Sequence, residues 1–138
     1  MSIREKAREL AMQTLYQYAI RGSEDFDARE SFGWQEDAGA PRVQDLAAEW
    51  AAAAIADINA IDALIDVHLR NWSGDRVGAV ERAILRLAVY ELRSSPDLAV
   101  EIIIDEAIKL AKRYCEDESF KFINGVLDAI AATLARKN

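Results

Sequence analysis

The chain has 138 residues, of which 51% are hydrophobic and 30% are charged, and its formal net charge at pH 7 is −7. This length predicts a single domain over residues 1–138, and the two prolines and six glycines leave few sites for the tight turns of a β-sandwich or β-barrel. One cysteine excludes an intramolecular disulfide, no apolar stretch is long enough to cross a bilayer, and no signal-peptide core follows Met1. We therefore expect an all-α protein of the cytoplasm with no membrane partner.

The first predicted helix begins near Met1 and ends at Gly22, where a glycine favours a left-handed cap. Its apolar positions recur at helical spacing. They are Ala7, Leu10, Ala11, Thr14, Leu15 and Tyr18. The polar side carries several cations, and residues 1–22 have a net charge of +2.

Residues 23–75 hold most of the acidity, with twelve acids against three arginines. Residues 23–42 resemble a long connection with a short helix around 27–32. From Val43 to Trp72 the pattern is helical, but it does not distinguish one bent helix from two. A field of one sign over the whole surface repels phosphate, whereas a segregated one does not. The acidity weakens the case for a nucleic-acid partner without excluding it.

The next helix follows a break in which Ser73 or Asp75 is the expected cap, and it ends before Pro96. Its apolar face is Val77, Val80, Ile84, Leu87 and Ala88. Two more helices follow, and Asp117 or Ser119 is the expected cap of the second. The apolar stripe of this last helix is Phe122, Ile123, Val126, Leu127, Ile130 and Leu134. Phe120 and Lys121 lie outside that stripe.

Three ordered motifs occupy residues 4–16, 80–92 and 104–128. They read REKARELAMQTLY, VERAILRLAVYEL and, in the third, IDEA followed by FINGVLD. Together they resemble the NusB family of bacterial transcription antitermination factors. The resemblance covers nearly the full length and is weak between about residues 22 and 75.

The resemblance implies an all-helical NusB-like fold of two packed three-helix halves. It also implies binding of the boxA element of ribosomal RNA leader transcripts, jointly with NusE, a small-subunit ribosomal protein. The expected result is an antitermination complex in which RNA polymerase reads through terminators. Some relatives form homodimers that hide the RNA surface, and the sequence leaves a homodimer open here.

The resemblance also implies two sets of contact residues. For RNA the motif gives Arg4 and Arg8, with Lys6 beside them. We add Tyr16, which shares a helix face with Arg8, and the off-stripe pair Phe120 and Lys121, of which Phe120 stands where the family often has a polar residue. The NusE-binding set is Glu81, Arg82 and Arg86. Arg8, Met12 and Tyr16 recur at i+4, so we expect a phosphate-binding cation beside an aromatic ring, as in recognition of single-stranded RNA. The alternative interpretation is a solvated helix start and a charged helix face with i+4 pairs.

Two departures from the family weaken the basic segment: Glu5 interrupts it, and Lys6 stands in place of an arginine. Lysine lacks the bidentate phosphate contact of a guanidinium. A second hypothesis is therefore a helical protein-interaction adaptor with weak or no RNA binding. A third, the domain that precedes an RNA methyltransferase, is disfavoured because no cofactor-binding domain follows before Asn138.

Catalysis has little support in the sequence. The single histidine, His68, and the single cysteine, Cys115, lie in unrelated segments, and no glycine-rich loop follows a strand. We expect no enzyme activity, no catalytic residue, no metal and no cofactor.

Overall fold

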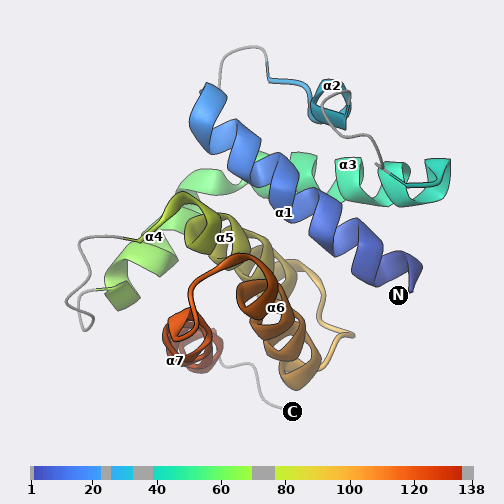
Figure 1. Cartoon of the computed structure of the whole chain (residues 1–138). Helices are drawn as coiled ribbons and strands as arrows, with labels where there is room; N and C mark the ends of the chain where they lie inside the picture. Colours follow the sequence, from blue (N-terminus) through green and yellow to red (C-terminus); the bar gives the residue numbers. More distant parts are fainter. Residues whose placement is uncertain (1, 23–25, 33–38, 70–76, 135–138) are drawn as a thin grey trace.

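The computed structural model describes residues 2–22, 26–32, 39–69 and 77–134 (Figure 1). These residues form seven helices and no strand, which confirms the all-α prediction. The helices are α1 (Ile3–Arg21), α2 (Ala28–Ser31), α3 (Pro41–Ala56), α4 (Ile58–Leu69), α5 (Ala79–Ser94), α6 (Val100–Tyr114) and α7 (Ser119–Thr133). No helix among them is long and apolar enough to cross a membrane.

Both ends of α1 are fixed by local sequence. The Ser2 hydroxyl accepts a hydrogen bond from the Glu5 backbone N–H, and the Glu5 carboxylate accepts one from the Ser2 backbone N–H. This reciprocal capping box satisfies two donors that a helix start leaves unpaired. At the other end Gly22 has a φ of +88° and donates its N–H to the Tyr18 carbonyl. The predicted glycine stop is confirmed.

The region from Val43 onward forms two helices, which settles the question that the sequence left open. Pro41 occupies the first turn of α3, where its missing N–H costs nothing. The chain leaves α3 at Asp57, whose backbone departs from helical geometry, and α4 begins at the next residue. The short predicted helix around 27–32 is also present as α2, capped by the Asp27 carboxylate.

Helix α5 is the centre of the fold, because it packs against α1, α3, α4, α6 and α7. Helix α1 lies across α3 and α5, and α2 lies next to α3 (Figure 1). Helices α6 and α7 pack together on the other side of α5, and α4 packs on both α5 and α7. The first three helices thus form one half of the molecule and the last four form the other.

Most of the predicted apolar stripes are buried. In α5 the buried positions include Ile84, Leu87 and Ala88, and Val80 is half-buried. Val77, predicted as part of the same face, is also half-buried but lies before the helix begins. The predicted helix caps are less accurate. The N-cap of α5 is Gly78, and Ser73 and Asp75 lie outside the described residues. The N-cap of α7 is Glu118, and neither Asp117 nor Ser119 supplies a capping side chain.

Candidate nucleic-acid interface

The first two turns of α1 present cations at different depths. Arg4 and Lys6 are exposed, and neither forms an ion pair with an acid in the described part of the chain. Arg8, one turn beyond Arg4, is only 5% exposed. The helix start therefore offers two available positive charges rather than three.

Arg8 is a correction to both interpretations made from the sequence, because each placed it at the surface. Its Nε donates to Glu91 Oε1 over 2.9 Å, and Glu91 is itself buried on α5. Burial raises the pKa of the Glu91 carboxyl, and the adjacent Arg8 and the more distant Arg4 act in the opposite direction. In this arrangement Arg8 joins α1 to α5 inside the protein.

Trp50 of α3 lies next to these arginines, and its sequence context gives no sign that it is a site residue. Its ring lies beneath the guanidinium groups of both Arg4 and Arg8. The signal that sequence reasoning could have used is the i+4 spacing of the two arginines, which places them on one helix face. Nothing in the sequence shows that α3 supplies the ring.

Tyr16 lies further along α1 and is 38% exposed, so its ring is available at the surface. The aromatic ring that Arg8 contacts is that of Trp50, whereas the sequence paired Arg8 with Tyr16. A second exposed tyrosine, Tyr114 at the end of α6, accepts a hydrogen bond from the Gln13 side chain over 3.1 Å. Tyr114 was missed because its contact with α1 spans 101 positions of sequence.

The start of α7 carries the other two predicted RNA contacts. Phe120 is half-buried and packs against the core, with Lys112 Nζ 4.7 Å from the centroid of its ring. Lys121 is exposed and pairs with Glu118 over 2.8 Å. Phe122, which the stripe placed in the core, is half-buried and packs against it. Phe120 is thus covered on part of its surface, and Lys121 already has an acidic partner.

A cavity of about 270 Å³ lies between α1 and α6. Its lining consists of Glu5, Arg8, Glu9, Glu106, Lys109, Leu110 and Arg113. Within it Arg113 pairs with Glu9, and Lys109 pairs with Glu106 over 3.4 Å. The acids and cations compensate each other, so this cavity does not offer a concentrated positive field to a phosphate.

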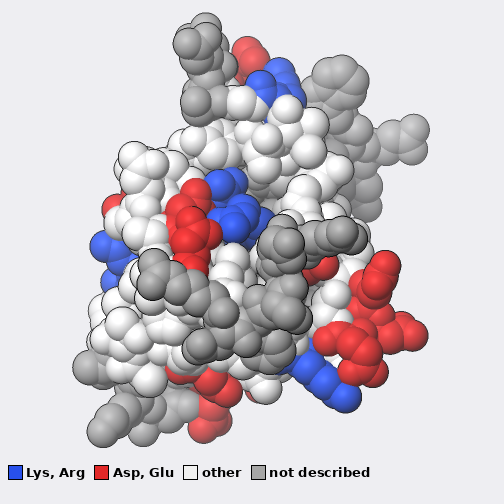
Figure 2. All heavy atoms as spheres, turned by 90° about the vertical axis from the view of Figure 1, so that its left-hand side faces the viewer, with Lys and Arg blue, Asp and Glu red and all other residues white. Residues whose placement is uncertain are grey.

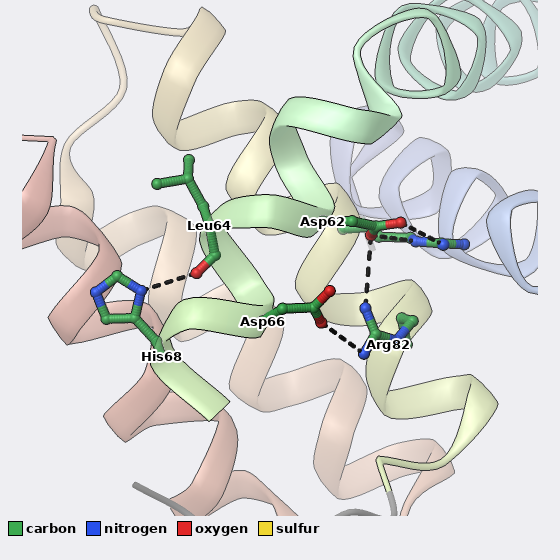
Figure 3. A network of polar contacts seen from close by, with 6 residues as sticks. Asp62, Leu64, Asp66, His68 and Arg82 are labelled. Atoms are coloured by element: carbon green, nitrogen blue, oxygen red, sulfur yellow. Dashed lines mark hydrogen bonds and ion pairs between the residues drawn. The ribbon is translucent and has the colours of Figure 1, made fainter. Parts of the chain in front are cut away.

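The predicted partner-binding arginines hold α4 against α5. Arg86 donates from Nε and Nη2 to the two oxygens of Asp62, over 2.9 and 2.8 Å. Arg82 Nη2 donates to Asp66 over 3.1 Å and also lies 3.6 Å from Asp62 through Nη1. Figure 3 shows both aspartates of α4 turned toward Arg82 of α5. Both arginines therefore have an intramolecular role in addition to any contact with a partner.

Glu81, the third predicted partner-binding residue, is half-buried at the start of α5. It lies beside the half-buried thiol of Cys115. Burial raises the pKa of the Cys115 thiol to about 11, and the Glu81 carboxylate adds to the increase. Such a thiol stays protonated at neutral pH and is a poor nucleophile.

His68 joins two helices. Its Nδ1 donates to the Leu64 carbonyl over 2.8 Å, as Figure 3 shows, and its Nε2 is hydrogen-bonded to Thr133 Oγ1 over 3.0 Å. These contacts link α4 to α7 and give the histidine a structural use. No group of three or more metal-ligating side chains occurs among the residues that the structure describes.

One side of the molecule is shown with all its atoms in Figure 2, and there the cations lie next to acids. The blue and red groups alternate among the described residues rather than forming a continuous basic patch. The described residues of this face therefore offer little net attraction to a polyanion. Two of the exposed cations that form no ion pair among the described residues, Arg4 and Lys6, lie together at the start of α1.

Comparison with known proteins gives consistent results. The sequence model described as the NusB family matches residues 5–132. The chain is 38% identical to the transcription antitermination protein NusB of Sorangium cellulosum, over 99% of this chain and 96% of that protein. It is 40% identical to the protein of the same name from Desulfotalea psychrophila, over 99% and 100% of the two chains.

Solved structures agree with the sequence comparison. One is described as antitermination factors NusB and NusE in complex with double-stranded RNA. The structure superposes on a chain of that complex with a TM-score of 0.79 and 31% identity, covering 96% of this chain and 98% of the other.

Proposed function

The chain belongs to the NusB family of transcription antitermination proteins, and from this premise we propose that it binds boxA-type RNA of ribosomal RNA leader transcripts together with NusE. The relative solved with NusE and RNA supports this proposal. In the proposed complex RNA polymerase reads through terminators.

The observation that carries the proposal is the pair of exposed, uncompensated cations at the start of α1, in a chain with this family's fold. Arg4 and Lys6 are available to phosphate, whereas most other cations with a described contact have an acidic partner. Phosphate contacts supply much of the affinity of nucleic-acid binding and make it depend on salt. The exposed ring of Tyr16, further along the same helix, is suited to stacking with a base.

The proposal gives the remaining predicted residues smaller or different roles. Phe120 and Lys121 lie at the start of α7 and extend the proposed RNA surface, with Lys121 exchanging Glu118 for phosphate. Arg8 does not contact the RNA in this proposal. It stabilises the proposed surface through its buried ion pair with Glu91. For NusE we propose the start of α5, where Glu81 is the residue least occupied by ion pairs, with Arg82 and Arg86 beside it.

The decisive experiment measures RNA affinity in the presence and absence of NusE. Fluorescence anisotropy would compare a labelled boxA RNA with a scrambled RNA of the same length and composition. We expect weak binding by this chain alone and tighter, sequence-dependent binding by the pair. Equal affinity of the pair for both RNAs would contradict the proposal.

The competing hypothesis, a protein-interaction adaptor with weak or no RNA binding, is favoured by the net charge of −7. It predicts that NusE binds normally while neither RNA binds. A Glu81→Ala variant tests the NusE surface in the same assay: it is expected to weaken NusE binding and leave the helical content unchanged. The homodimer stays a prediction, and sedimentation equilibrium of this chain with and without NusE would test it.

A further inference from the structure

Two arginines of α1 share one aromatic ring of α3. The guanidinium carbon of Arg4 lies 5.0 Å from the centroid of the Trp50 ring, and that of Arg8 lies 6.0 Å from it. Guanidinium groups at this distance are attracted to the face of an indole, which is the most favourable aromatic partner for a cation. Trp50 is only 8% exposed, so packing within the core fixes its ring. The ring is a rigid support for otherwise flexible side chains.

The two guanidinium groups differ in charge balance. Arg8 is buried and paired with Glu91 over 2.9 Å, so its charge is compensated inside the protein. Arg4 is exposed and forms no ion pair among the described residues, although its charge also acts on Glu91 from a greater distance. Like charges at i and i+4 on a helix repel each other, and Glu91 relieves that repulsion by neutralising the inner one. The result is one uncompensated guanidinium held over a fixed ring.

Stacking leaves the hydrogen-bonding edge of a guanidinium free. The group is planar and its N–H donors lie in that plane, so a contact through its face leaves those donors free. Two of those donors match two oxygens of a phosphate, in a geometry that lysine cannot provide. An arginine already held flat also loses less conformational freedom on binding than a mobile one. This combination suits the phosphodiester backbone of a nucleic acid.

We propose that Trp50 is a positioning residue for RNA binding, which holds the Arg4 guanidinium flat so that its N–H edge meets a backbone phosphate. This inference rests on the proposed function, because it assumes that the chain binds RNA. Arg8, which is paired with Glu91, also contacts the Trp50 ring and helps to keep it in place. Lys6 adds charge nearby without comparable orientation.

The test is a double-mutant cycle on RNA affinity, with NusE present and a boxA-containing RNA as the probe. Trp50→Leu is expected to weaken binding by about three- to tenfold, the range of a cation–π contact at a partly exposed site. Trp50→Phe retains an aromatic face and should lose less. In the Arg4→Ala background, Trp50→Leu should cost nothing further, because the residue that it positions is gone.

Because Trp50 is buried, its replacement can disturb folding, so a variant of the exposed Arg4 gives a second test that leaves the core unchanged. Arg4→Lys preserves the charge but not the planar fork, and it leaves Trp50 in place. We expect it to weaken binding in the wild-type background and to have no further effect beside Trp50→Leu. Arg29→Ala is the matched control, since Arg29 is an exposed arginine of α2 that pairs with Asp45; its RNA affinity should stay within about twofold of wild type.

Each result has a definite meaning. Equal losses from Trp50→Leu with and without Arg4 would show that Trp50 acts only through the fold, and would overturn the inference. Wild-type affinity of Arg4→Lys would overturn it as well, even if Trp50→Leu did not fold. Failure of the wild-type pair to prefer boxA over scrambled RNA would overturn the proposed function, and this inference with it.

Discussion

Arg8 illustrates why a basic residue in a helix start is not always a surface charge. Removing a guanidinium from water costs several kcal/mol unless an opposite charge and further contacts compensate. Here Glu91 supplies the charge and Trp50 supplies a ring. The hydrogen-bonded partner lies 83 positions away along the chain. Sequence spacing alone places Arg8 on a helix face, but it does not show that other helices cover that face.

The Arg8–Glu91 pair leads to a prediction about stability. Arg8→Ala should lower the free energy of unfolding by about 3–5 kcal/mol, because it leaves the Glu91 carboxylate buried without a partner. Replacing both residues, as in Arg8→Met with Glu91→Leu, should cost much less than the single change. Urea denaturation followed by circular dichroism would measure both. An exposed ion pair would give a loss of unfolding free energy below about 1 kcal/mol. Such a small loss for Arg8→Ala would contradict the burial of this pair.

Cys115 gives a prediction about pH. Its thiol pKa of about 11, raised by burial and by Glu81, means that the folded state binds the proton more tightly than the unfolded state does. The stability from this group is therefore fully present below the ordinary pKa of 9 and is lost as the pH rises through 11. The rate of alkylation by iodoacetamide should rise about tenfold per pH unit from 8 to 10. A plateau near pH 9 would contradict the raised pKa.

At the scale of elements, α4 and α5 are joined by a ladder of ion pairs. Its rungs are Asp62–Arg86, Asp66–Arg82 and, from the residue directly before α4, Asp57–Arg93. Residue numbers rise along α4 as they fall along α5, so the two helices run antiparallel. The Asp62–Arg86 rung is the most sheltered, since the Arg86 side chain is only 12% exposed. Arg86 also lies over the ring of Tyr18, which connects the ladder to α1.

We predict that the rungs contribute unequally to stability. Asp62→Ala removes the acceptor of two Arg86 hydrogen bonds and leaves a sheltered guanidinium unpaired, which should cost about 1–3 kcal/mol. Asp66→Ala breaks a more exposed pair and should cost less than about 1 kcal/mol. Denaturation in urea would compare the two variants, with Asp45→Ala as a control for an exposed pair on α3. If Asp62→Ala and Asp66→Ala lowered the free energy of unfolding equally, burial would not determine how much each ion pair contributes.

The helices themselves could be predicted because their signal is local. Positions such as Ala7, Leu10 and Ala11 recur at helical spacing, and the structure buries all three. The break at Asp57 and the cap at Gly78 could not be predicted in the same way. Alanine-rich sequence continues through the first without a helix-breaking residue, and the second uses a backbone conformation rather than a capping side chain.

At the scale of the whole molecule, the candidate site combines residues from separate helices, which limits what sequence can show. Arg4, Lys6 and Tyr16 could be proposed because they share one helix. Trp50 meets Arg4 only through tertiary packing, and Tyr114 meets α1 at Gln13 in the same way. The molecule also carries its positive charges within an excess of acids, for a net −7. An RNA approaching the start of α1 therefore meets a local attraction within a wider repulsion.

This balance predicts that removing exposed acids outside the start of α1 strengthens RNA binding only at low salt. Asp105→Asn with Asp128→Asn changes two exposed acids of α6 and α7 and raises the net charge from −7 to −5. At about 0.05 M salt, affinity with NusE present should rise by roughly two- to fivefold, because the Debye length there is more than about 10 Å and the field of these acids extends further from the surface. At about 1 M salt, where that length is about 3 Å, the variant and wild type should bind alike. Anisotropy titrations over a salt series would measure the difference. A gain that persists at high salt would place these acids in direct contact with the RNA, whereas a gain that disappears would assign them to the long-range field.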